Sequence, residues 1–135
     1  MVRKDELGLT LLRLILGITF LIHGLDKFQG GIANTAAFFE SLGMPGFAAY
    51  VVALVELLGG IAMILGLGTR VVAGLFAIIM AVAILKVKLA IGFLGNGQMA
   101  GYELDLILLV VSVYLALKSK SFLALDNILF RTKKD

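Results

Sequence analysis

Two charged side chains interrupt long apolar stretches of this sequence. Arg13 and Glu56 each lie well inside such a stretch. A charged side chain at the centre of a bilayer costs at least ~2.5–3.5 kcal/mol, and such residues usually face neighbouring helices at a functional site. Pairing would offset much of the cost of burying both charges. We therefore expect Arg13 and Glu56 to form a structural ion pair between two helices.

A second group of titratable side chains lies near the ends of three apolar stretches. Histidine changes its protonation state readily near neutral pH, and polar groups in an apolar pocket can exchange protons with a bound ring. The residues predicted to exchange protons are His23, Lys88 and Glu103. The residues predicted to bind a substrate are His23, Lys27, Glu56, Lys86 and Asp105.

The same residues also have purely structural explanations. A buried Arg13–Glu56 pair can fix helix register without any chemistry. Lysines near helix ends can extend to the lipid head groups, and a lone histidine near an interface can serve only as a hydrogen-bonded residue. The sequence leaves these alternatives open.

Helical geometry limits how many of the outer charges can face inward. Residues two apart on a helix point to nearly opposite faces. We therefore expect only one of Lys86 and Lys88, and one of Glu103 and Asp105, to point into a helix bundle. Small residues share the faces of Lys88 and Asp105, which favours these two.

The composition is that of a membrane protein. Of 135 residues, 61% are hydrophobic and 16% are charged, whereas a soluble domain has roughly 45–50% and 25%. The length indicates a single domain over residues 1–135. The formal charge of +3 does not indicate nucleic-acid binding, because the basic residues flank the apolar stretches.

Cysteine is absent and histidine occurs once. The sequence therefore excludes a thiol redox couple, a thiolate metal site and bis-histidine haem ligation. It also contains no flavin or nicotinamide fingerprint. We expect no metal site, and no resident cofactor is evident.

Four apolar stretches are long enough to be considered as spans. An apolar helix of roughly 20 residues crosses the ~30 Å hydrocarbon core of a bilayer. The predicted fold is all-α, an integral membrane four-helix bundle with a short interfacial helix in the first outward loop. The spans are predicted at about residues 7–28, 48–66, 71–93 and 102–117.

Glycine and asparagine positions refine this arrangement. Asn34 is expected to cap the short helix, over residues 35–42, and Gly43 to end it. Gly17 is expected to pack against Gly59 and Gly60, because small residues let helices approach closely. The glycine-rich residues 94–101 are expected to form a turn.

Charge distribution predicts the orientation in the membrane. An even number of spans puts both termini on one side, and basic residues are concentrated there, including Arg70 and residues 118–134 of the tail. By the positive-inside rule both termini are cytoplasmic, in a multi-pass protein of the cell membrane. Apolar residues 122–125 and 128–130 of the tail are expected to rest on the membrane.

Several motifs are spread over nearly the whole chain. They are Arg13-x-x-x-Gly17-x-x-Phe20-Leu21-x-His23-Gly24-x-x-Lys27-Phe28, Phe39-x-x-x-Gly43-x-Pro45, Glu56-Leu57-x-Gly59-Gly60, Leu65-Gly66-Leu67-Gly68-Thr69-Arg70 and Gly101-Tyr102-Glu103-Leu104. Together these motifs resemble the DoxX family. The tail Ala124-Leu125-Asp126 departs from the family's Ser-Leu-Asp ending at its first residue. The resemblance is strongest to short members associated with catechol and hydroquinone resistance, which are named as candidate oxidoreductases.

The resemblance implies a membrane four-helix bundle linked to quinones, catechols or redox stress. The expected function is therefore that of a membrane oxidoreductase, or a subunit of one, that detoxifies such aromatics, with a quinone as substrate. Electrons would come from a soluble redox enzyme at the cytoplasmic face or pass between bound quinols. The alternatives are a non-enzymatic membrane binder or anchor for a detoxifying enzyme, and a small proton-coupled transporter. Under each of these functions the protein could be a homo-oligomer.

Overall fold

The computed structural model describes residues 4–117, and the tail predicted to rest on the membrane lies outside them. Within that range the secondary structure is helical, apart from one isolated β-bridge in the loop before the last helix. The helices are α1 (Lys4–Gln29), α2 (Ile32–Ser41), α3 (Phe47–Leu65), α4 (Thr69–Ala83), a π-helical turn (Ile84–Lys88) that continues α4, and α5 (Glu103–Leu117).

Three helices are long and apolar enough to cross a membrane: α1, α3, and α4 with its π-helical turn. The described part of α5 has 15 residues, which at about 1.5 Å per residue extends roughly 22 Å. Large apolar side chains lie exposed along the outer face of α1, at Leu11, Ile15, Ile18 and Ile22. Their spacing of three and four residues makes a continuous apolar stripe, as contact with lipid requires.

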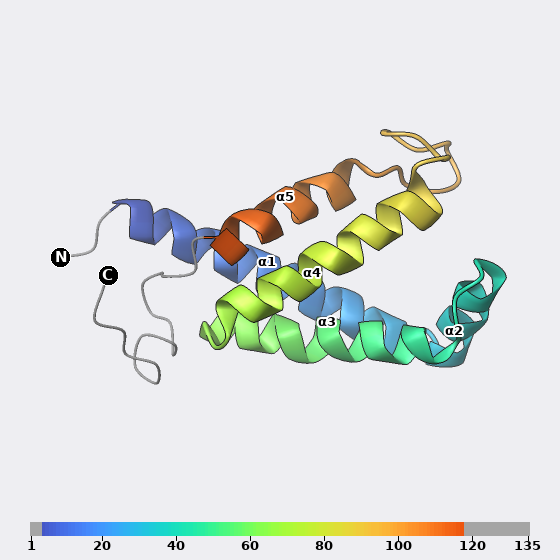
Figure 1. Cartoon of the computed structure of the whole chain (residues 1–135), viewed down its shortest axis with the longest axis horizontal. Helices are drawn as coiled ribbons and strands as arrows, with labels where there is room; N and C mark the ends of the chain where they lie inside the picture. The colour runs from blue at the N-terminus through green and yellow to red at the C-terminus, as the bar shows by residue number, and fades with distance from the viewer. Residues whose placement is uncertain (1–3, 118–135) are drawn as a thin grey trace.

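The helices form two pairs that diverge from one end of the molecule (Figure 1). In the first pair α1 packs along α3, and in the second α4 packs along α5. Near the N-terminal end of α1, the turn through Gly66 and Gly68 brings α3 directly into α4, and both glycines have the positive φ that the turn needs. From there α4 rises away from α3 (Figure 1), so the two pairs separate toward the end where α2 lies.

Aromatic and aliphatic side chains fill the core where the two pairs meet. Phe20 of α1 stacks on Phe76 of α4, with ring centroids 3.7 Å apart and planes at 9°. Leu16, Met63 and Leu115 are buried around this stack. The core therefore ties both pairs together at one end and leaves the other end open for a site.

Close packing of glycines fixes the register of α1 against α3. A Cβ placed on Gly17 would lie 2.9 Å from the backbone oxygen of Gly60, and one on Gly24 would lie 2.7 Å from the backbone nitrogen of Leu57. The predicted contact of Gly17 with Gly60 is thus confirmed. Gly59 faces Phe76 of α4 instead of α1.

The segment between α1 and α3 differs from the prediction in detail. The short helix exists as α2, but it begins at Ile32 after Gly31, so Asn34 lies within its first turn and does not cap it. The side-chain amide of Asn34 instead donates to the backbone oxygen of Gly30 at 3.2 Å. Gly43 follows the helix with a φ of +88°, as expected of a residue that ends it.

The third apolar stretch ends earlier than predicted, at Lys88 and not near residue 93. Residues 89–101 form a loop with the expected turn at its tip, where the Asn96 side-chain oxygen accepts hydrogen bonds from the backbone of Gln98 and Met99. The ring of Phe93 packs edge-on against Tyr102, with centroids 5.4 Å apart. Hydropathy alone cannot separate this apolar loop from the helix before it.

Candidate functional site

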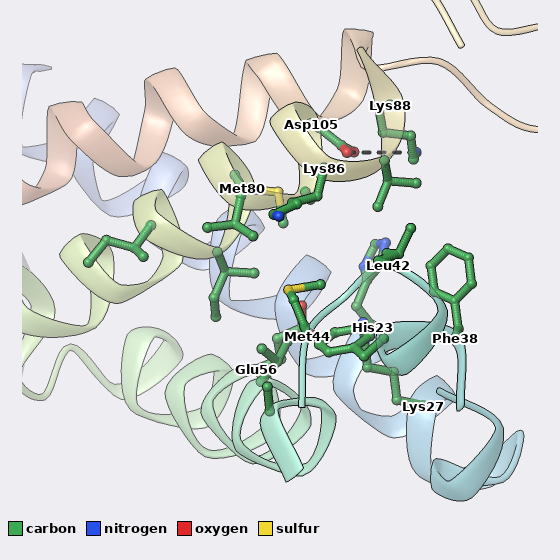
Figure 2. A pocket seen from close by; sticks show the side chains of 18 of the residues that line it. His23, Lys27, Phe38, Leu42, Met44, Glu56, Met80, Lys86, Lys88 and Asp105 are labelled. Atoms are coloured by element: carbon green, nitrogen blue, oxygen red, sulfur yellow. Dashed lines mark hydrogen bonds and ion pairs between the residues drawn. The ribbon is translucent and has the colours of Figure 1, made fainter. Parts of the chain in front are cut away.

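A cavity of about 480 Å³ lies between the two helix pairs on the side of α2. Ligand sites in proteins commonly measure about 300–1,000 Å³ and are lined mainly by apolar side chains with a few polar groups. The polar residues that line this cavity are His23, Lys27, Glu56, Lys86, Lys88 and Asp105. Figure 2 shows them on both sides of the space, His23, Lys27 and Glu56 on one side and Lys86, Lys88 and Asp105 on the other.

Helical periodicity explains why one face of each helix reaches the cavity. On α1 the lining residues are Phe20, His23 and Lys27, spaced three and four apart. On α3 they are Ala48, Val52 and Glu56, each one turn apart. The structure therefore brings together all five residues predicted to bind a substrate.

Glu56 forms an ion pair with Lys27, whose Nζ lies 2.7 Å from Oε1. The Glu56 side chain is only 3% exposed, whereas that of Lys27 is 23% exposed. Lys27 therefore pairs with a buried carboxylate, while its own ammonium group stays partly exposed at the cavity. A short charge-assisted hydrogen bond of this kind is stronger than a neutral one.

This pairing corrects the predicted Arg13–Glu56 pair. The glycine contacts set Gly17 opposite Gly60, so Arg13, one turn earlier in α1, lies level with the end of α3. There its Nη2 donates to the backbone oxygen of Ile64 at 3.5 Å, and the residue is buried. Glu56 lies one turn from Gly60 in the opposite direction, which places it within reach of Lys27.

Lys88 and Asp105 connect the π-helical turn with α5. Lys88 Nζ lies 3.6 Å from Asp105 Oδ2 and 3.4 Å from the backbone oxygen of Gly101. Glu103, in contrast, is exposed and does not line the cavity. The structure therefore does not bring Glu103 to the site where it was expected to exchange protons.

The π-helical turn supplies both lysines to the cavity, although only one was expected to face it. The backbone nitrogen of Leu89 donates to the oxygen of Ile84 at 2.8 Å, which is the five-residue spacing of a π-helix. Lys88 reaches toward α5, while Lys86 extends into the space facing Met44 (Figure 2). Such turns occur often at functional sites.

His23 has a defined tautomer when it is neutral. Its Nδ1 lies 2.7 Å from the backbone oxygen of Thr19. A carbonyl oxygen only accepts hydrogen bonds, so Nδ1 must carry a hydrogen and the neutral ring has its lone pair on Nε2. His23 is exposed at the cavity, so Nε2 is available to accept a proton or, in the imidazolium form, to donate one.

Apolar residues, none of which was predicted as a site residue, make up most of the wall. Those contributed by α2 and the residues after it are Phe38, Phe39, Leu42 and Met44, and others are Met80 of α4 and Met99 of the loop. The sequence could not show that these side chains cover a cavity, since that depends on the divergence of α4 from α3 (Figure 1).

The arrangement can hold an apolar ring and offer polar groups to its oxygen atoms. Methionine and phenylalanine side chains adapt to and stack on flat aromatic molecules. Two ion pairs and one histidine supply donors, acceptors and exchangeable protons. Within residues 4–117, no three His, Cys, Asp or Glu side chains lie together so as to hold a metal ion.

Comparison with known proteins agrees with this architecture. The DoxX family model matches residues 8–89. A protein of Bacillus subtilis (strain 168) named "Putative oxidoreductase CatD" is 47% identical over 133 residues, which is 98% of this chain and 95% of the relative. The "Inner membrane protein YqjF" of Escherichia coli (strain K12) is 34% identical over 73 residues, 54% of this chain and 55% of the relative.

No solved structure matches the chain. The family match covers more than half of the sequence, and the Bacillus relative extends the likeness to nearly all of it. The chain belongs to the DoxX family of membrane proteins.

Proposed function

We propose that this protein is a membrane oxidoreductase, or the membrane subunit of one, that acts on quinone- or catechol-type aromatics. The observation that carries the proposal is the apolar cavity with His23 and two ion pairs on its walls. The name of the Bacillus relative supports an oxidoreductase. The resemblance to members associated with catechol and hydroquinone resistance supports this substrate class and a role in detoxification.

Side chains that line the cavity would supply the protons of the reaction. Reducing a quinone to a quinol takes two electrons and two protons. The His23 imidazolium would donate one proton through Nε2, and the Lys88 ammonium, held by Asp105, would donate the other. Both groups would regain their protons from water at the open side of the cavity.

The electrons would come from a reduced partner enzyme that reaches the open side of the cavity or from a second, bound quinol. The chain has no cysteine and so no thiol couple of its own. In the first case the protein is the quinone-binding subunit of a two-component enzyme. In the second it transfers reducing equivalents between two aromatics, one quinol being oxidised as one quinone is reduced.

An anaerobic titration in lipid nanodiscs tests this function. The purified protein would be mixed with benzoquinone and methylhydroquinone, and the absorbance of both redox couples followed. We expect exchange between them to be faster than in empty nanodiscs, and the His23→Ala variant to lose most of that gain, since positioned proton transfer typically contributes about 10²–10⁴-fold.

Asp26→Asn is the matched control, because Asp26 lies three residues along α1 from His23, is exposed and does not line the cavity. It should behave like the native protein. Saturable binding with no redox change, even after a whole-cell extract is added as a source of reductase, would contradict the enzymatic proposal and favour a non-enzymatic binder. Uptake of the quinol into sealed liposomes would favour a transporter.

We further propose that α5 is the fourth span, that α2 lies at the outer interface, and that both termini are cytoplasmic. The short, apolar α2 has no buried residue, as suits a helix at the lipid head groups. Arg70, in the first turn of α4 and so at the end of that helix away from α2, is exposed and adds to the basic side. The site would then open in the outer half of the membrane.

Single cysteines test this topology cleanly, because the native chain has none. In intact cells a membrane-impermeant maleimide should label Gln98→Cys in the outer loop. It should leave Lys4→Cys and Ser121→Cys unlabelled until the cells are opened. Labelling of Ser121→Cys in intact cells would show that α5 does not cross the membrane.

A further inference from the structure

Lys86 differs from the other two cations that line the cavity. Lys27 is paired with Glu56, and Lys88 with Asp105. No carboxylate among residues 4–117 lies within ion-pair distance of Lys86. The cavity wall therefore carries three lysines and two carboxylates, and with His23 neutral one positive charge is uncompensated.

The position of Lys86 makes that charge available to a ligand. Its side chain extends into the space between α4 and the segment after α2 (Figure 2), toward Met44. Apolar side chains, among them Val82, Ala83 and Met80, line the wall beside it. A molecule seated there would place its apolar body on these side chains and one charged atom on the lysine.

We propose that the cavity selects the singly charged anion of an amphipathic ligand, with Lys86 as the residue that binds its oxyanion. The ligand class is an aromatic ring bearing one ionised phenolic or enolic oxygen. A lipid phosphate shares the same chemistry, an oxyanion on an apolar body, and is the competing source. This inference rests on the proposed function, since it specifies the ionisation state of that function's substrate.

The proposal gives Lys86 a role that the paired lysines cannot take. Ammonium–oxyanion hydrogen bonds are stronger than neutral ones, and a partly apolar surrounding screens them less than bulk water does. Lys27 and Lys88 would have to give up a carboxylate to bind a ligand anion. Lys86 would give up only bound water when it binds the anion, because its side chain is exposed at the cavity.

A pair of ligands that differ only in charge tests the proposal. The anion of 2-hydroxy-1,4-naphthoquinone forms at neutral pH, whereas its methyl ether, 2-methoxy-1,4-naphthoquinone, is neutral. Binding to nanodiscs of zwitterionic lipid would be measured by calorimetry, with empty nanodiscs as the baseline. We expect the native protein to bind the anion about tenfold more tightly than the ether, the worth of one charge-assisted hydrogen bond.

Variants assign that preference to one side chain. In Lys86→Gln the ratio of the two affinities should fall close to one, while the ether binds as tightly as it does to the native protein. Lys86→Arg should retain most of the preference for the anion. Lys4→Gln, at the far end of α1, removes the same charge outside the cavity and should change nothing. Equal affinity of the native protein for both ligands, or an unchanged preference in Lys86→Gln, would overturn the inference.

The same measurement separates this inference from the proposed function. If the protein binds both ligands equally well, only the role of Lys86 is refuted. If it binds neither ligand, the aromatic site is refuted and the inference fails with it. Nanodiscs that contain phosphatidylglycerol distinguish the two anion sources. If phosphatidylglycerol competes with the aromatic anion, and this competition is lost in Lys86→Gln, the oxyanion site belongs to lipid phosphate. If the lipid does not compete, the site belongs to the aromatic ligand.

Discussion

Replacing Lys27 by methionine should destabilise the protein more than any other single change to the charges of the cavity. The variant leaves the Glu56 carboxylate, 3% exposed, with no cation beside it. Removing one partner of a buried pair costs about 3–5 kcal/mol, because an uncompensated charge remains in a poorly solvated place. The unfolding midpoint in a denaturing-detergent titration, followed by circular dichroism, should fall accordingly.

The reciprocal change should be milder, because the two partners are unequally buried. Glu56→Gln keeps an oxygen that can accept from Lys27 Nζ, and the lysine, 23% exposed, can turn its head toward water. The double variant Lys27→Met/Glu56→Met should recover most of the stability, since an apolar pair of similar volume often replaces a buried ion pair at little cost.

Lys88→Met provides the matched comparison within the same cavity. Its pair with Asp105 is longer, at 3.6 Å, and the Asp105 side chain is 13% exposed, so the carboxylate left behind stays better hydrated. We expect a smaller loss of stability than in Lys27→Met. If Lys27→Met unfolds at the same midpoint as the native protein, Glu56 does not depend on its ion pair.

The sequence predicts the helices well, because they follow directly from apolar length and from glycine. The first two spans begin and end within three residues of their predicted bounds. The third does not, since the apolar residues after Lys88 resemble a continuing helix until the π-helical turn and the loop end it. Hydropathy counts apolar side chains and does not tell whether the backbone that carries them is a helix or a loop.

The sequence predicts the polar residues of the candidate site but only some of the contacts between them. The cost of burying two single charges leads to the expectation that Arg13 pairs with Glu56. The observed pair follows from a second glycine contact, because Gly24 lies against the backbone of Leu57, which adjoins Glu56, and Lys27 lies three residues further along α1. The register of α1 against α3 is set by backbone contacts between the two helices. The residue pattern of one helix alone does not reveal these contacts.

The cavity itself could not be read from the sequence, because it results from how far α4 diverges from α3 (Figure 1). Apolar periodicity shows which face of a helix is buried, not how close its neighbour lies. The apolar walls, from Phe38 to Met99, therefore looked like ordinary packing residues. Only the polar residues among them carried a signal that pointed to function.

Replacing Gly60 by alanine should disrupt the contact on which the site's register depends. A Cβ at this position would lie 2.6 Å from the backbone nitrogen of Leu21 and 2.8 Å from the backbone oxygen of Gly17. Both are backbone atoms, so no side-chain rotation relieves the clash, and α1 must move away from α3. Overpacking of this kind costs roughly 1–3 kcal/mol.

Gly74→Ala is the matched control, the same substitution within a membrane-length helix with nothing within 4 Å of the new Cβ. It should leave stability unchanged or raise it slightly, because alanine favours a helix by up to about 1 kcal/mol over glycine. Gly60→Ala should lower the unfolding midpoint and also weaken quinone binding, since the displaced α1 carries His23 and Lys27. Equal midpoints for the two variants would show that the α1–α3 interface tolerates separation, and the glycine contact would then not set the geometry of the cavity.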